Sequence, residues 1–471
     1  MNTKIGLIGI GLSTYWAQFE GLYDKLCRYQ QFIADKITEE NVSVINAGLV
    51  DDPDKAQTAA ETLVKEDVEI IFLYISTYAL SSTVLPVVQK VNKPVIILNL
   101  QPTPAIDIDT LNSLADRGKM TGMWLEHCQA CAVPEVCAVL NRTQITYDII
   151  SGYLEEEQSW QLIKQYIAAA KVKNTLSHCR LGILGHYYNG MLDVYTDITR
   201  QQSVFGIHFQ LLEMCELNKY REEVTDEQKS DKIAQFSRLF EIVPECSGAE
   251  INRAAQTAVA LDCLIEKHHL GGMAYYYEGT PGGTYENIIT SVIAGNTILT
   301  AHNIPIAGEC EVKNLIAMKI LSLLGAGGSF AEFYGIDFND DIVMLGHDGP
   351  AHLNIAEGSV KLVPLPLYHG KPGQGLSIQM TVKYGPVTLL SVVETEGTVA
   401  LLVAQGESVP GKILQIGNTN SRYRFPIDVK SFINKWSKAG PSHHCAIGSG
   451  HYGAEIEKLA TLLSIPVIRI C

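Results

Sequence analysis

The feature that most constrains this chain is the alternation of short apolar runs with amphipathic segments over residues 1–174. Runs rich in valine and isoleucine, such as Ile5–Ile10 and Val68–Ile75, are separated by segments with helical periodicity, such as Asp54–Lys65. Near-continuous apolar strands separated by helices are typical of a parallel sheet that helices cover on both faces. We therefore predict a doubly wound α/β domain over residues 1–174.

The same alternation continues over residues 175–325. Strands are expected at Arg180–Leu184 and Gly272–Tyr277, and helices at Gly248–His268, Thr284–Gly295 and Val312–Leu324. This pattern predicts a second doubly wound α/β domain over residues 175–325.

The period changes from residue 326 onward. Val387–Glu394 and Thr398–Val403 alternate or run apolar, with glycine-containing turns between them, as strands of an antiparallel meander do. One helix, Ala454–Leu463, is expected near the end. The predicted fold class is α/β, with two doubly wound α/β domains followed by a mostly antiparallel, barrel-like β domain over residues 326–471.

Composition limits the partners and the compartment. Lys plus Arg number 36 and Asp plus Glu 51, a net charge of −15, and no basic run is present. This balance argues against nucleic acid and anionic membranes as partners. The chain enters a strand pattern at once, and its 11 scattered cysteines fit reduced thiols. We therefore expect a cytoplasmic protein.

Two short motifs suggest other functions. Gly9 and Gly11 follow the first strand as in a dinucleotide fingerprint, but Thr14 occupies the third glycine position, so a generic turn explains them equally well. Cys128 and Cys131 form a C-x-x-C motif without a second C-x-x-C or a paired histidine at finger spacing. A zinc or redox role for this pair stays open.

Four glycine-flanked segments carry carboxylates and histidines. They contain Glu309, Glu332, His347 and the adjacent pair His443-His444. Each has an ordinary reading taken singly: a helix N-terminal acid, a solvated strand residue, a core histidine and a surface loop. Together, two glutamates and two histidines make an oxygen and nitrogen ligand set without thiolate. Such a set suits Mn²⁺, with Co²⁺ or Mg²⁺ as alternatives.

These segments resemble the L-arabinose isomerase family, within the arabinose/fucose isomerase group. The resemblance rests on the order and spacing of four motifs: Gly308-Glu309-Cys310-Glu311, Gly327–Tyr334 (GGSFAEFY), Leu345-Gly346-His347 and His443-His444. It implies a metal-dependent aldose–ketose isomerase with a small sugar substrate. It also implies that Glu309, Glu332, His347 and His444 bind the metal and that the two glutamates are catalytic.

Weaker matches concern the sugar pocket. The resemblance implies that His127 and Met191 line it and that His443 contacts the substrate or orients its neighbour. It further implies a homo-oligomer, a trimer or hexamer, with His127 supplied by a neighbouring subunit. A helix-surface role for His127 and a core role for Met191 are equally consistent with the sequence.

Departures from the family motif affect the substrate more than the metal. A Gln-His-Leu-Tyr-Gly-like motif is replaced by Gly11–Trp16, and Gly308-Glu309 is followed by Cys310-Glu311 instead of Gly-Asp. L-arabinose is the first expectation, with another pentose, a deoxyhexose or a modified sugar as alternatives. A related isomerase or epimerase and a non-catalytic sugar-binding protein also remain open. The pair of acids beside a metal favours catalysis over binding alone.

Overall fold

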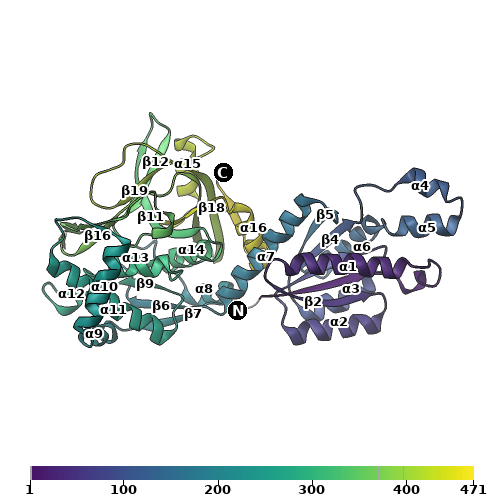
Figure 1. Ribbon diagram of the computed structural model, residues 1–471, viewed down its shortest axis with the longest axis horizontal. Coiled ribbons are helices and arrows are strands. Elements are labelled where there is room, and N and C mark those ends of the chain that lie inside the picture. The colour runs from purple at the N-terminus through teal and green to yellow at the C-terminus, as the bar shows by residue number, and fades with distance from the viewer. Residues whose placement is uncertain (1–2, 369–370, 396) are drawn as a thin grey trace. The chain divides into compact units, whose positions relative to one another are not determined.

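The chain forms two compact units, Met1–Asn174 and Thr175–Cys471. The computed structural model describes residues 3–368, 371–395 and 397–471 (Figure 1). Parallel sheets with helices build the α/β parts, and a closed antiparallel barrel of six strands follows them. The predicted fold class is therefore confirmed, whereas the three domain boundaries stay a prediction.

The first unit is a five-stranded parallel sheet with strand order β2-β1-β3-β4-β5. This order is that of a doubly wound sheet, with helices on both faces (Figure 1). The strands are β1 (Lys4–Ile10), β2 (Ser43–Val50), β3 (Ile70–Ile75), β4 (Val95–Gln101) and β5 (Tyr147–Tyr153). The helices are α1 (Leu22–Thr38), α2 (Pro53–Glu66), α3 (Ser81–Val91), α4 (Ile108–Ser113), α5 (Arg117–Leu125), α6 (Gln129–Arg142) and α7 (Glu157–Ser177). All six residues of β3 are buried, which explains its unbroken apolar sequence.

The glycine pattern after β1 has a packing explanation. A Cβ added at Gly9 would lie 2.2 Å from the side-chain oxygen of Gln30, so a larger residue there would require this side chain to move. Asp51 accepts hydrogen bonds from the Trp16 indole at 2.6 Å and from Lys55 at 2.7 Å. These contacts account for Gly9 and Asp51 without a dinucleotide.

The second unit begins with a four-stranded parallel sheet of order β10-β9-β6-β7. Its strands are β6 (Arg180–Gly185), β7 (His208–Leu212), β9 (Gly272–Tyr276) and β10 (Ile306–Ala307). The helices are α8 (Ile198–Phe205), α9 (Met214–Glu222), α10 (Asp226–Leu239), α11 (Gly248–His268), α12 (Thr284–Ile289), α13 (Ile293–Ala301) and α14 (Val312–Leu323).

The barrel closes because β17 pairs with both β20 and β18. Its strands are β11 (Gly327–Asp337), β12 (Ile342–His347), β17 (Gly385–Thr395), β18 (Thr398–Val409), β19 (Thr419–Arg424) and β20 (His444–Ser449), and β21 (Val467–Arg469) adds to β18 in parallel. A small sheet joins β16 (Leu376–Gln379), β13 (Lys361–Pro364) and β8 (Glu241–Ile242), and β14 (Leu367–Tyr368) pairs with β15 (Lys371–Pro372). The remaining helices are α15 (Val429–Lys438) and α16 (Gly453–Leu463).

One apolar core runs through both parts of the second unit. It contains Leu261 of α11, Leu389 of β17 and Trp436 of α15. Helix α14 is buried from Val312 to Ser322 and packs against both the parallel sheet and the barrel. This helix therefore fixes the position of the residues that precede it, among them Glu309 and Glu311.

One expected helix needs correction, and one helix was not expected. The helix predicted over Thr284–Gly295 is two helices, and at the break the hydroxyls of Thr290 and Ser291 bond back to the carbonyls of Glu286 and Asn287. The barrel part also contains α15 in addition to the predicted last helix.

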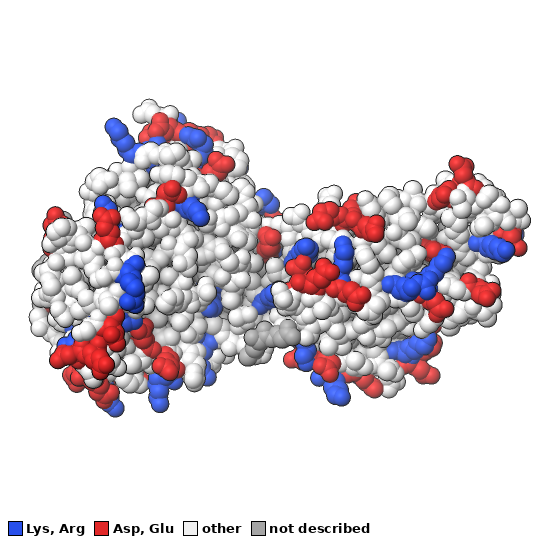
Figure 2. All heavy atoms as spheres, viewed as in Figure 1, with Lys and Arg blue, Asp and Glu red and all other residues white. Residues whose placement is uncertain are grey.

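Charge is spread over both units. Within the part of the chain that the structure describes, Figure 2 shows acidic and basic side chains interspersed on the visible face, with acidic groups gathered over α9 and α10. Among the described helices, none combines the length and the apolar character that a membrane span requires.

Candidate metal centre and active site

Strand register brings Glu332 and His444 together, and ring packing adds His347. Glu332 on β11 lies directly opposite His444 on β20 and opposite Gly346 on β12, next to His347. Side chains of directly opposite residues stand on the same face of a sheet. The ring of Phe330, two residues before Glu332 on β11, packs against both His347 and His444, with centroids 4.6 and 4.4 Å away. The barrel therefore positions Glu332, His347 and His444.

Glu309 reaches the same place from the parallel sheet. It follows β10 and lies two residues before Glu311, the N-cap of α14, and the start of this helix at Val312 agrees with the prediction. Glu309 and Cys310 both have left-handed backbone conformations, with φ of 52° and 58°. Two such non-glycine residues in succession cost about 1–3 kcal/mol each and tend to occur where a site requires them. The turn is held by a hydrogen bond from Cys310 N–H to the Tyr275 carbonyl at 2.9 Å.

Glu309, His347 and His444 form what we call the inner set. Their candidate ligand atoms all lie within 4.8 Å of one another, and the three residues are 8%, 4% and 1% exposed. Glu309 Oε2 and His444 Nε2 are 3.5 Å apart, and among the described residues neither atom has a hydrogen-bond partner. Buried polar atoms are nearly always hydrogen-bonded, so this pair is suited to a ligand.

Glu311 determines which nitrogen of His444 faces that space. The His444 Nδ1 hydrogen-bonds to the Glu311 carboxylate, and both residues are almost fully buried. Because a carboxylate only accepts, Nδ1 carries the proton and Nε2 presents its lone pair. A carboxylate behind the second nitrogen of a histidine is the usual arrangement at metal sites.

His347 is held differently. The amide N–H of Gly349 donates to its Nδ1 at 2.8 Å, and the Asp348 carboxylate lies 3.3 Å from the same nitrogen. The amide and the carboxylate make opposite demands on Nδ1, so these contacts do not fix the tautomer of His347 as Glu311 fixes that of His444. The environment of His347 is therefore less suited to ligation than that of His444.

Glu332, His443 and His444 form what we call the outer set. Their candidate ligand atoms also meet the 4.8 Å limit, but the side chains of Glu332 and His443 are 27% and 34% exposed. His443 Nε2 lies 3.5 Å from Glu309 and 4.0 Å from Glu332. The two glutamates therefore flank one imidazole, and the outer set faces an accessible space.

Asp193 holds His443 in place. Its Oδ2 accepts from His443 Nδ1 at 2.6 Å and from His443 N–H at 3.0 Å. Its carbonyl accepts from Lys313 Nζ at 2.6 Å and Ser442 Oγ at 3.1 Å. Burial opposes the charge on His443, but its contacts with Glu309 and Asp193 outweigh this and raise its pKa to about 9. A charged imidazolium donates hydrogen bonds and does not bind a metal.

His443 lowers the pKa values of two neighbouring carboxylates, Glu309 and Asp193. Burial alone would raise the pKa of Glu309, but the charged His443 beside it holds the pKa below the usual value. Burial likewise opposes ionisation of Asp193, and His443 lowers its pKa. Both groups are therefore ionised at neutral pH.

The donor chemistry of this cluster fits a divalent cation. Two glutamates and two histidines supply oxygen and nitrogen ligands of the kind that Mn²⁺ and Co²⁺ accept. The carboxylates of Glu309, Glu311, Glu332 and Asp193 give the surroundings a negative potential that favours a cation. The structure brings all four sequence-predicted ligands together, and their role as ligands stays a prediction.

A cavity of about 370 Å³ opens beside the outer set. Its lining includes Asp193, Glu332, Phe333, Trp436 and His443. Aromatic rings combined with a few polar groups are typical of sites for small polar ligands. Carboxylate, imidazole and indole thus meet at one cavity.

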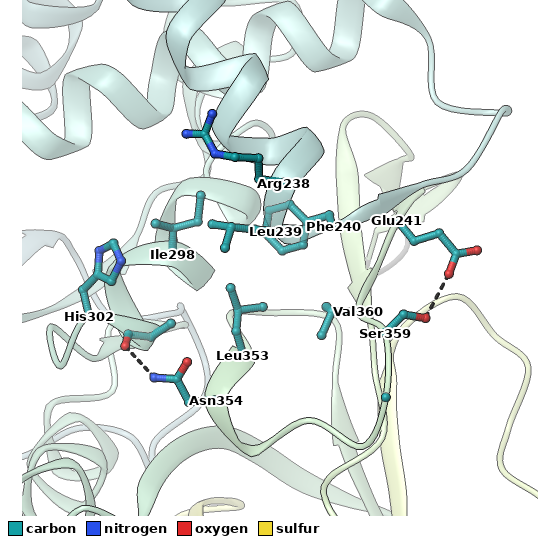
Figure 3. Close-up of a pocket in the computed structure, with 12 residues that line it drawn as sticks. Arg238, Leu239, Phe240, Glu241, Ile298, His302, Leu353, Asn354, Ser359 and Val360 are labelled. Carbon is teal, nitrogen blue, oxygen red and sulfur yellow. Dashed lines mark hydrogen bonds between the residues drawn. The ribbon is translucent and has the colours of Figure 1, made fainter.

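A larger cavity in the same unit, about 480 Å³, lies elsewhere (Figure 3). Its apolar wall contains Phe240, Leu353 and Val360, and its polar groups are largely engaged. Glu241 accepts from Ser359 at 2.9 Å, and Asn354 donates to the Ala301 carbonyl at 2.9 Å. Among the described residues, no cluster of three metal-binding side chains lies there.

Two predicted substrate residues lie outside this cluster. His127 follows α5 in the first unit, where its Nε2 hydrogen-bonds to Thr103 Oγ1 at 2.9 Å. Met191 is half-buried, two residues before Asp193 in the loop after β6. Their contact with substrate stays a prediction.

The sequence motifs did not identify Asp193 and Trp436 as site residues. His444 was expected in a loop before the last helix, whereas it begins β20. Asp193 lies 250 residues from His443 in the chain, so no local pattern links them. Trp436 had a usable signal, because Asp428 caps α15 and Phe432 and Trp436 are four residues apart on one face.

Comparison with known proteins points to sugar isomerases. Residues 359–470 match the family described as L-fucose isomerase, C-terminal domain. The chain is also 20% identical over 336 residues to a sulfoquinovose isomerase from Alkalicoccus urumqiensis, covering 70% of this chain and 74% of that protein. These matches support a sugar isomerase of the fucose/arabinose isomerase type. They do not single out L-arabinose isomerase.

Proposed function

We propose that this protein is a divalent-metal-dependent aldose–ketose isomerase that acts through a cis-enediol. The similarity to sugar isomerases supports the reaction class. The observation that carries the metal-dependent chemistry is the buried pair Glu309 and His444, backed by Glu311 and adjoining the second carboxylate, Glu332. A protein that only bound sugar would gain nothing from such an arrangement.

The two catalytic glutamates divide two proton transfers between them. One carboxylate removes the proton from C2 of the open-chain aldose and returns it to C1. The other carries a proton from O2 to O1, so that the aldehyde becomes a hydroxyl and the C2 hydroxyl becomes the ketone. Glu309 and Glu332 suit these roles because both lie within 4.0 Å of the same nitrogen of His443. His443 donates hydrogen bonds to substrate oxygens at the cavity wall.

Glu309, Glu332, His347 and His444 would hold the cation, with Mn²⁺ as the first choice and Co²⁺ or Mg²⁺ as alternatives. A bound divalent cation polarises the carbonyl and stabilises negative charge on the substrate oxygens. Glu311 keeps the Nε2 lone pair of His444 directed at the site. Phe330 covers the two ligand imidazoles and limits the access of water.

Two sugars lead the candidates for the substrate. The motif resemblance favours an L-arabinose-like pentose. The name of the relative from Alkalicoccus urumqiensis adds sulfoquinovose. Hydroxyl groups of Ser437 and Ser442 line the cavity with the ring of Trp436, which suits the polar edges and apolar face of a sugar.

We further propose a homo-oligomer in which His127 enters the pocket of a neighbouring subunit. The resemblance is the basis for this proposal. A mixture of His127→Ala chains with Glu332→Gln chains tests it. Recovery of activity on mixing two inactive variants would support a shared site, and no recovery under exchange conditions would contradict it.

A ketose-formation screen tests the proposed reaction. The full chain is stripped with EDTA, supplied with Mn²⁺, and offered L-arabinose, other pentoses, hexoses, deoxy sugars and sulfoquinovose. We expect Mn²⁺-dependent conversion of one sugar class. Conversion that EDTA leaves unchanged would contradict metal dependence. Bound Mn²⁺ with no conversion across the panel would contradict the substrate class.

A further inference from the structure

A pair of cysteines in the first unit has no part in the proposed reaction. Cys128 is the N-cap of α6, and Cys131 lies in the first turn of the same helix. Their Sγ atoms are 2.9 Å apart. Both are free thiols, as are the other nine cysteines of the chain. The spacing and the helix turn thus bring two nucleophilic sulfurs into contact.

The two thiols differ in accessibility. Cys128 is 2% exposed and packs in a small apolar cluster with Leu22, Leu26 and Leu125. Cys131 is exposed. A reagent from solution therefore meets Cys131 first, while Cys128 is within reach of any adduct formed on it. Burial and the neighbouring Cys131 thiol raise the pKa of Cys128 to about 12, so this thiol is protonated at neutral pH.

A metal explains the pair less well than a disulfide does. Structural zinc sites use four protein ligands, and catalytic ones use three. Among the described residues, neither cysteine belongs to a group of three or more side chains that could hold an ion. A disulfide needs only the two sulfurs and a Cα separation that residues three apart at the start of a helix provide.

We propose that Cys128 and Cys131 form a reversible intramolecular disulfide by exchange with a low-molecular-weight disulfide of the glutathione type. The Cys131 thiolate attacks one sulfur of that disulfide, which breaks its S–S bond and releases one small thiol. The Cys128 sulfur then loses its proton to solvent, attacks the Cys131 sulfur and displaces the second small thiol. Two protein thiols are oxidised, and one small disulfide is reduced to two thiols.

A disulfide between Cys128 and Cys131 would affect the segment that holds His127. Cys128 follows His127 directly, and Gln129 donates from its side chain to the carbonyls of Ser76 and Glu126. A disulfide would add a covalent link to this turn at the start of α6. The local redox state would then constrain the segment that holds His127. The disulfide itself does not depend on the proposed isomerase function.

Peptide mapping of the full chain tests the proposal. The protein is incubated with excess glutathione disulfide, the remaining thiols are alkylated, and the 128–131 peptide is analysed by mass. We expect an internal disulfide in the wild type that dithiothreitol reverses. Cys128→Ser should retain one glutathione on Cys131, so that the wild type loses two thiols in this peptide for each one lost by the variant. Cys131→Ser should leave Cys128 unreacted.

Controls separate this outcome from general thiol reactivity and from metal binding. Cys137→Ser, also on α6, should form the disulfide like the wild type. Exposed Cys215 should form only a mixed disulfide. Wild type that stops at a Cys131–glutathione adduct, or that does not react, would overturn the proposal. Protection of both thiols by stoichiometric Zn²⁺ alone would overturn it in favour of a metal site.

Discussion

The inner and outer sets share His444 but differ in their burial. The inner set is nearly closed to solvent, and two of its facing atoms have no hydrogen-bond partner among the described residues. The outer set lines a cavity, and its His443 is held by Asp193. A buried, preorganised set suits an ion that stays, whereas a half-exposed set suits a substrate that comes and goes. Residues of the same types thus suit different roles because their burial differs.

The adjacent histidines show this difference most clearly. His443 and His444 are neighbours in sequence with ring centroids 3.9 Å apart. His444 donates to a buried carboxylate and presents a lone pair, whereas His443 donates to the carboxylate of Asp193 at the cavity edge. Both rings donate Nδ1–H to a carboxylate, so their different burial and the groups that face Nε2 separate their roles.

The largest effect is expected from the catalytic glutamates. Glu309→Gln and Glu332→Gln should each lower kcat by about 10²–10⁴-fold, because neutral amides cannot transfer the protons. Glu309→Gln should also lower the affinity for Mn²⁺ more than Glu332→Gln does, since water cannot replace the buried carboxylate of Glu309. Steady-state kinetics and calorimetric Mn²⁺ titration check both statements.

Glu407→Gln, an exposed change on the same barrel, serves as the control for intact folding. Near-normal turnover in both glutamate variants would contradict the proposed mechanism. Equal losses of Mn²⁺ affinity would contradict the different roles of the inner and outer sets.

The histidine pair gives the next largest effect. His444→Ala should lower Mn²⁺ affinity about 100-fold, because it removes a buried ligand, and His443→Ala should lower it less than about tenfold. Thermal shift with added Mn²⁺ provides a second readout, since an ion that binds the folded state raises stability by about 2.7 kcal/mol at 100 times its Kd. His302→Ala, at the other cavity, is the matched control. Equal losses, or the reverse order, would mean that the roles of the two histidines are exchanged.

Glu311→Gln should have an intermediate effect. Its amide oxygen can still accept from His444, but the negative charge is lost, and changes in such partners typically cost 10–100-fold in metal affinity or activity. Mn²⁺ titration checks this. An unchanged affinity would show that Glu311 supports the fold alone.

The smallest effect is expected from Asp193→Asn. We expect about a tenfold loss of kcat/KM with Mn²⁺ affinity nearly unchanged, because His443 loses its ionic partner while the inner set is untouched. Kinetics and Mn²⁺ titration on the same preparation separate the two quantities. A large loss of Mn²⁺ affinity would place Asp193 with the inner set.

The sequence predicts more of the fold and the ligand cluster than of the pocket. Apolar runs such as β3 predict buried parallel strands because their composition has no other stable placement. Glu332, His347 and His444 belong to motifs with a characteristic spacing; strand register brings Glu332 and His444 together, and packing on Phe330 adds His347.

The remainder depends on contacts that no local pattern encodes. Asp193 meets His443 only because the loop after β6 and the start of β20 approach each other in the folded unit. The break between α12 and α13 coincides with hydrogen bonds from the hydroxyls of Thr290 and Ser291 to backbone carbonyls, which the apolar pattern does not reveal. The left-handed turn at Glu309 and Cys310 is unfavourable locally and persists because the surrounding structure requires it.

The most direct test of the central claim is the rate of ketose formation by EDTA-stripped protein before and after Mn²⁺ is returned. The sugar is the one that the screen identifies, and bound Mn²⁺ is counted on the same sample. The proposed mechanism predicts no turnover without metal and full recovery when one ion per chain has bound. Turnover that is independent of EDTA and Mn²⁺ would contradict it.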